Sequence, residues 1–198
     1  NDCSWKMTKT IWLINPPDTF LDKAGDRPPL ALAYLSAYIK QYNHKTKIWD
    51  CNHIIPTLKD AFTDKPDFVC ITVATPNYMK SIEIANSFIL LRYGKYRRIF
   101  SHKFKLIAGG AHVSAYPNEE LTLKVFDFIV AGHGDGEQAL LDIIENKIKD
   151  KIVKASFIEN LDSLPLPDYN SLDLDKYSMM LEGKKAITMS TSRGCVYS

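Results

Sequence analysis

The sequence has no long hydrophobic run, almost no excess of charge of either sign and only four cysteines. No apolar run approaches the roughly 18 residues that a membrane-spanning helix needs, so we expect no membrane span. The 25 Lys and Arg residues nearly balance the 23 Asp and Glu residues, and the net charge of +2 gives no reason to expect nucleic acid or an acidic membrane as a partner. The hydrophobic content of 45% excludes a disordered chain.

The four cysteines are Cys3, Cys51, Cys70 and Cys195, and none forms a C-x-x-C pair. Cys51 and Cys70 stand in apolar, strand-like surroundings, where a small buried thiol is the usual role of the residue. A disulfide framework is therefore not expected. This pattern fits a reducing compartment and predicts a cytoplasmic protein.

A basic stretch, residues 92–105, carries interleaved aromatic residues and no acidic residue. Such a composition can bind single-stranded nucleic acid. We interpret it instead as a solvated helix end and loop, because it precedes a predicted strand and lies opposite the edge where a ligand is expected. No nucleic-acid partner is predicted.

Short apolar runs alternate with segments of helical periodicity over most of the chain. Strands are expected at residues 11–14, 47–50, 68–73, 104–108 and 128–131. Helices are expected at residues 30–39 and 81–91 and from Gly136 or Glu137 onward. The alternation predicts a Rossmann-like, doubly wound α/β domain with five parallel strands over residues 8–150, and residues 151–158 are a candidate for an extra edge strand.

The remaining residues lack this alternation. Residues 151–185 are interpreted as a linker that includes the edge segment, since two prolines and several acidic residues interrupt the pattern. One more strand is expected at residues 186–190, shortly before the chain stops.

In an open parallel sheet, ligands bind beyond the carboxyl ends of the strands. The segments that follow four of the predicted strands are small, polar or rich in glycine, which lets a backbone approach a ligand and suits a phosphate at the start of a helix. The candidate binding residues are Asn15, Pro16, Pro17, Thr72, Ala74, Thr75, Asn77, Gly109, Gly110, His112, Ser114, Gly132, His133, Gly134, Gly136 and Glu137.

The sequence motifs of common nucleotide-binding sites do not occur in the segments at this edge. The loop after the first strand has no glycine before Gly25, so the G-x-G-x-x-G fingerprint of dinucleotide sites is absent there, and no P-loop occurs. A zinc site would need three ligands of the kind that His112 and His133 supply. We interpret these two histidines instead as residues that pack on a ligand or bond to the backbone.

Taken together and in order, five segments resemble the N-terminal cobalamin (B12)-binding domain of B12-dependent radical SAM enzymes. They are Asn-Pro-Pro (15–17), Pro-Pro-Leu-Ala-Leu-Ala-Tyr-Leu (28–35), Pro-Asp-Phe-Val-Cys-Ile-Thr (66–72), Ala-Gly-Gly-Ala-His-Val-Ser (108–114) and Val-Ala-Gly-His-Gly-Asp-Gly-Glu (130–137). Residues 161–169 are similar to the linker that joins that domain to the radical SAM barrel. Residues 191–198 resemble the opening of the barrel's C-x-x-x-C-x-x-C cluster loop.

The resemblance implies base-off cobalamin with no protein His on cobalt. Relatives that supply such a His carry it in a D-x-H-x-x-G motif after the first strand, and residues 16–25 contain no His. The nucleotide tail would lie between the sheet edge and the loops at 109–110 and 132–137. The corrin would then cross the strand ends near Asn15, Thr75 and Asn77, with Ala74 facing the lower side of cobalt.

Cys195 is the single candidate ligand of a 4Fe-4S cluster, because the next two cysteines of the motif would fall at positions 199 and 202, past the last residue. We therefore expect residues 186–198 to be the first strand and truncated cluster loop of a barrel that is missing here. The cluster and S-adenosylmethionine would be bound only by the full-length protein, which the resemblance implies to be a transferase for methyl groups or an enzyme of related radical chemistry. The fragment is expected to be inactive alone.

Two other interpretations stay open at this point. One is a non-catalytic domain of the same fold with an empty crevice. The other is a flavodoxin-like nucleotide or flavin binder, although the first loop is not rich in the hydroxyl groups that a flavin phosphate would favour.

Overall fold

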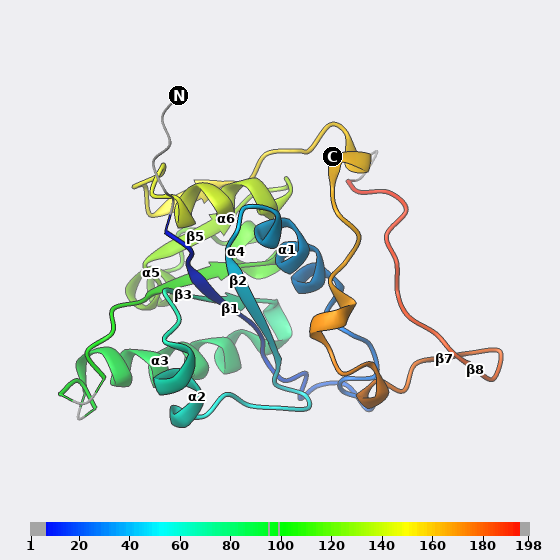
Figure 1. Cartoon of the computed structure of the whole chain (residues 1–198), viewed down its shortest axis with the longest axis horizontal. Coiled ribbons are helices and arrows are strands. Elements are labelled where there is room, and N and C mark those ends of the chain that lie inside the picture. The colour runs from blue at the N-terminus through cyan, green and yellow to red at the C-terminus, as the bar shows by residue number, and fades with distance from the viewer. Residues whose placement is uncertain (1–6, 95, 99, 195–198) are drawn as a thin grey trace.

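The computed structural model describes residues 7–94, 96–98 and 100–194 and arranges them around a parallel sheet (Figure 1). The strand order is β2-β1-β3-β4-β5-β6, and every neighbouring pair is parallel. The strands are β1 (Thr10–Asn15), β2 (Lys45–Asp50), β3 (Phe68–Thr72), β4 (Lys105–Gly109), β5 (Phe128–Ala131) and β6 (Ile152–Lys154). The predicted doubly wound fold is confirmed, and the candidate edge segment adds β6 as a sixth strand.

Helices cover both faces of this sheet. On one face lie α1 (Leu30–Gln41) and α6 (Gly136–Ile144), above the sheet in Figure 1. On the other face lie α2 (Leu58–Asp64), α3 (Tyr78–Tyr93), α4 (Ala111–Ala115) and α5 (Glu120–Val125). This arrangement explains why the strands are continuous apolar runs, since each side of the sheet has its own core.

Strand β1 shows how one run of residues serves both cores. The side chains of Ile11 and Leu13 pack with α1 and α6, whereas Trp12 and Ile14 pack with α3 and α5, and all four are fully buried.

Cys51 and Cys70 are free thiols buried inside the protein, as predicted. Desolvation raises the pKa of both thiols, to about 12 for Cys51, so neither is a thiolate at neutral pH.

The segment after β6 follows the surface of the domain instead of leaving it. It contains the short 3-10 turns η2 (Leu161–Ser163), η3 (Tyr169–Ser171) and η4 (Leu174–Lys176) and a hairpin of β7 (Met180–Leu181) with β8 (Lys184–Lys185). In Figure 1 its orange part runs beside α1, and the β7–β8 hairpin and the red stretch lie further out on the right. The expectation of a strand at residues 186–190 was wrong, because no strand pairs with that backbone within the part of the chain that the structure describes.

None of the described helices combines the length and the apolar character that crossing a membrane requires.

Candidate functional site

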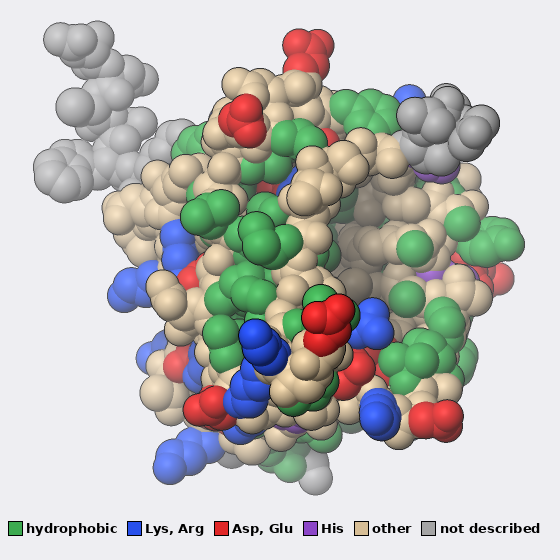
Figure 2. Space-filling model, turned by 90° about the vertical axis from the view of Figure 1, so that its right-hand side faces the viewer, with side chains coloured by type: hydrophobic (Ala, Val, Ile, Leu, Met, Phe, Trp, Pro, Cys, Tyr) green, Lys and Arg blue, Asp and Glu red, His purple; other side chains and the backbone are tan. Residues whose placement is uncertain are grey.

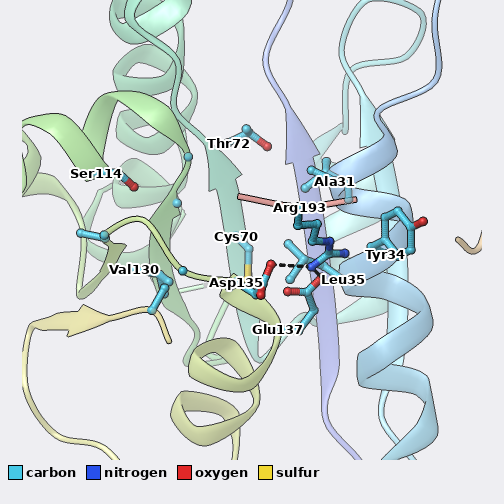
Figure 3. A pocket seen from close by; sticks show the side chains of 18 of the residues that line it. Ala31, Tyr34, Leu35, Cys70, Thr72, Ser114, Val130, Asp135, Glu137 and Arg193 are labelled. Carbon is cyan, nitrogen blue, oxygen red and sulfur yellow. Dashed lines mark hydrogen bonds and ion pairs between the residues drawn. The ribbon is translucent and has the colours of Figure 1, made fainter. Parts of the chain in front are cut away.

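A cavity of about 610 Å³ opens at the carboxyl edge of the sheet, between α1 and the loops that follow β4 and β5 (Figure 3). The order of the strands reverses between β1 and β3, so the cavity lies beside the switch point where ligands bind in such folds. Its volume is within the range of about 300–1,000 Å³ that is usual for small-molecule sites. Figure 2 shows the molecule hollowed on this side.

Half of the predicted binding residues line this cavity. They are Thr72, Gly109, Gly110, Ser114, Gly132, Gly134, Gly136 and Glu137. The other half lie outside its lining, namely Asn15, Pro16, Pro17, Ala74, Thr75, Asn77, His112 and His133. The predicted residues therefore divide between the cavity and the adjoining loops.

The glycines of the lining have two different roles. A Cβ on Gly109 would meet no atom within 4 Å, so the absence of a side chain there leaves open space in the cavity. Gly110 has a φ of +117°, and a Cβ there would lie 2.7 Å from the carbonyl oxygen of Val73. Gly110 is thus required by the turn itself, whereas Gly109 keeps the cavity wide.

Helix α1 supplies the apolar wall that faces these glycines. Ala31, Tyr34 and Leu35 project from it into the cavity (Figure 3). This wall was not predicted from the sequence, because helical periodicity does not separate a face that packs on a core from a face that lines a cavity. Pro28 and Pro29 place the start of the helix at the mouth of the site.

The charged group of the cavity was also missed. The Arg193 guanidinium lies 2.8 Å from carboxylate oxygens of both Asp135 and Glu137 and stacks over the Tyr34 ring, 4.7 Å from its centroid (Figure 3). Burial alone would lower the pKa of Arg193, but the two ion pairs outweigh it and raise the pKa further. The Asp-x-Glu pair at the start of α6 was the available signal, since a nearby cation stabilises two neighbouring carboxylates in their ionised form.

Asn15 and Asn77 are occupied by contacts within the protein. The Asn15 amide donates to the Asp50 carboxylate over 3.1 Å, and the Asn77 side-chain oxygen accepts from the Ala74 backbone N–H over 3.0 Å. These bonds fix the loops after β1 and β3 at the edge of the sheet.

His112 links two of the loops and is not arranged as a metal ligand. Its Nδ1 lies 3.1 Å from the Thr75 hydroxyl, its Nε2 lies 2.7 Å from the Glu119 carboxylate, and its ring stacks on Tyr78. The hydrogen bond from His112 holds the pKa of Glu119 below its ordinary value. The described residues contain no group of three or more His, Cys, Asp or Glu side chains that could hold a metal, His133 is exposed, and Cys195 lies outside the described residues.

Comparison with known proteins places this site in context. The model of the B12 binding domain family matches residues 20–143, which include most of the cavity lining. An uncharacterized methyltransferase of Pyrococcus horikoshii is 25% identical over 219 residues, which cover 97% of this chain and 44% of the relative.

Two solved structures share the fold at low sequence identity. The cobalamin-dependent S-adenosylmethionine radical enzyme OxsB, with aqua-cobalamin and S-adenosylmethionine bound, aligns over 96% of this chain with a TM-score of 0.67 and 20% identity. The radical S-adenosylmethionine methyltransferase TsrM of Kitasatospora setae aligns over 72% with a TM-score of 0.51 and 18% identity. This chain covers 27% of each of those chains, so it corresponds to one part of them.

Proposed function

This chain belongs to the B12-binding domain family, and from that premise we propose that it binds cobalamin with the nucleotide tail in the cavity beside α1. The observation that carries the proposal is the open space at Gly109, where the wall of the cavity is backbone and a side chain would fill it. A flat heterocycle fits between such a wall and an apolar helix face. Thr72 and Ser114 offer hydroxyl groups beside it.

The other candidate residues are assigned to the corrin ring. The loops with Asn15, Pro16, Pro17, Ala74 and Thr75 follow β1 and β3, the two strands at the switch point, and would lie beneath the ring. Asn77 and His112 would support these loops from within, since their side chains are buried in hydrogen bonds. His133 would stand at the rim.

We assign no protein His to cobalt, and the cofactor would be bound base-off because its nucleotide tail would lie in the cavity, away from the metal. In support, both ring nitrogens of His112 have protein partners, and the Nε2 of His53 lies 2.8 Å from the Gly25 carbonyl oxygen. Bound cobalamin supplies a cobalt centre that can carry a methyl group. The chain's own part is to bind the tail, hold the ring at the sheet edge and keep His side chains away from the metal.

The domain is proposed to work within a longer radical SAM enzyme that transfers methyl groups or carries out related radical chemistry. The likeness to OxsB and TsrM and the Cys195 motif support this context. In it, residues 8–150 bind cobalamin, residues 151–185 connect, and residues 186–198 begin a barrel that would hold a 4Fe-4S cluster and S-adenosylmethionine. The cytoplasm is the proposed location, in accord with the buried free thiols.

Titration of the purified chain with hydroxocobalamin tests the proposal. Gel filtration should retain about one equivalent of cobalamin with the protein, and the visible spectrum of the protein peak should be base-off. Flavin mononucleotide serves as the competing ligand. Retention of the flavin without cobalamin would contradict the proposal and favour the flavodoxin-like alternative, and retention of neither would favour an empty crevice.

A further inference from the structure

We propose that Arg193 is a positioning residue that lets the cavity accept the negatively charged phosphate of the nucleotide tail, an inference that rests on the proposed function. The lining of the cavity within the described residues contains three charged side chains, those of Asp135, Glu137 and Arg193. With Arg193 in place, the net charge of these three side chains is −1, and without its cation it would be −2.

The two carboxylates are too buried for water to screen them well. The side chains of Asp135 and Glu137 are 10% and 4% exposed, and both lie 2.8 Å from the same guanidinium nitrogen. Removing the cation would leave them facing each other and any anionic group that enters, in a medium of lower dielectric than water. A phosphate would then be repelled at short range.

Arg193 is part of the wall and does not plug the cavity. The volume of about 610 Å³ is present with the Arg193 side chain in place, and Ser190 of the same segment also lines it. The Tyr34 ring supports the guanidinium from α1, and the Tyr169 hydroxyl donates to the Thr188 carbonyl, which fixes the chain just before it. The side chain is thus held at the edge of a space that remains open.

This assignment makes the C-terminal segment part of the binding site. The family model ends at residue 143, whereas Ala155, Ser190 and Arg193 all contribute to the lining. In the sequence, Arg193 lies two residues before Cys195, the candidate cluster ligand.

The test compares two corrinoids in the full chain. Dicyanocobinamide lacks the phosphate and the nucleotide, and hydroxocobalamin has both. Arg193→Gln should weaken the binding of hydroxocobalamin about tenfold or more and change the binding of dicyanocobinamide by less than about twofold. Arg193→Lys should restore most of the affinity because it keeps the charge.

The double variant Glu137→Gln/Arg193→Gln separates the charge from the fold. If Arg193 acts by neutralising Glu137, removing both charges should bind hydroxocobalamin more tightly than Arg193→Gln alone. Arg92→Gln is the matched control, since Arg92 forms a 2.8 Å ion pair with Asp127 at the far edge of the sheet and should leave both affinities unchanged.

The outcomes are distinguishable. Equal loss of affinity for both corrinoids in Arg193→Gln, or no loss for either, would overturn the role of Arg193 while the wild-type chain still binds cobalamin. Absence of cobalamin binding in the wild-type chain would instead overturn the proposed function and this inference with it.

Discussion

The Ser36 hydroxyl donates a 2.5 Å hydrogen bond to the Asp168 carboxylate and so joins α1 to a turn that lies 132 residues further along the chain. The Lys40 ammonium and the Ser171 hydroxyl donate to the same carboxylate oxygen. Asp168 also donates its backbone N–H to the Ala33 carbonyl. This cluster holds the C-terminal segment against the helix that forms the apolar wall of the cavity.

Asp168→Asn should detach this segment in part. The Asp168 side chain is 11% exposed, and loss of its charge weakens several hydrogen bonds at once. We expect a decrease of about 1–2 kcal/mol in the free energy of unfolding, measured by urea denaturation, and faster proteolysis of the segment. The exposed Asp173, whose carboxylate lies 3.6 Å from Lys176, gives a matched control in Asp173→Asn, which should change stability by less than about 0.5 kcal/mol. An equal loss of stability in the two variants would contradict the role of Asp168 in holding the C-terminal segment against α1.

We expect the Asp168 carboxylate to make the free energy of unfolding depend on pH. Burial by itself raises the pKa of Asp168, but hydrogen bonds from Lys40, Ser171 and Ser36 outweigh it and hold the pKa below its ordinary value. Its contribution to stability should be complete above the unfolded pKa of about 4 and be lost as the pH falls through the folded pKa. Urea titrations between pH 6 and 2 should show a smaller acid-induced loss in Asp168→Asn than in the wild type. If the unfolding free energies of the variant and the wild type fell equally with pH, Asp168 would not be the source of this pH dependence.

Gly109→Val should fill the cavity without disturbing the fold. A side chain there enters open space, and Val suits a strand, so we expect stability to change by less than about 1 kcal/mol. Hydroxocobalamin affinity should fall more than about tenfold because the bulk occupies the place of the tail. Lys105→Val changes the other end of β4, away from the cavity, and should leave binding intact. Unchanged affinity in Gly109→Val would place the tail elsewhere.

His112→Ala should affect the fold but not the cobalt spectrum. The substitution removes the bonds to Thr75 and Glu119 from a side chain that is 7% exposed, so we expect a loss of about 2 kcal/mol in unfolding free energy. The base-off spectrum of bound cobalamin should persist. His133→Ala, at an exposed position, should change neither property. A spectral shift in either variant would identify that His as a cobalt ligand.

The fold could be predicted from the sequence because the residues that end its strands act locally. Asn15, Pro16 and Pro17 end the first strand, and the apolar runs that follow have the length and content of buried parallel strands. The rule that such strands place their carboxyl ends together was then enough to predict the edge at which the cavity opens, and half of the predicted binding residues line that cavity.

The rest of the site depends on contacts that sequence spacing does not reveal. Arg193 reaches Asp135 from 58 residues away, along a segment whose sequence shows no periodicity. The strand predicted at residues 186–190 is absent for a similar reason. An apolar run becomes a strand only where another backbone pairs with it, and the sequence does not show whether such a partner is present.

The most direct test of the account is the set of backbone amide shifts in the isotopically labelled chain, recorded with hydroxocobalamin and with dicyanocobinamide. If the nucleotide tail occupies the cavity, the amides of Gly109, Gly110, Gly132 and Gly134 should shift strongly with hydroxocobalamin and far less with dicyanocobinamide. Binding that leaves these four amides unmoved, or moves them equally with both corrinoids, would contradict the placement of the tail.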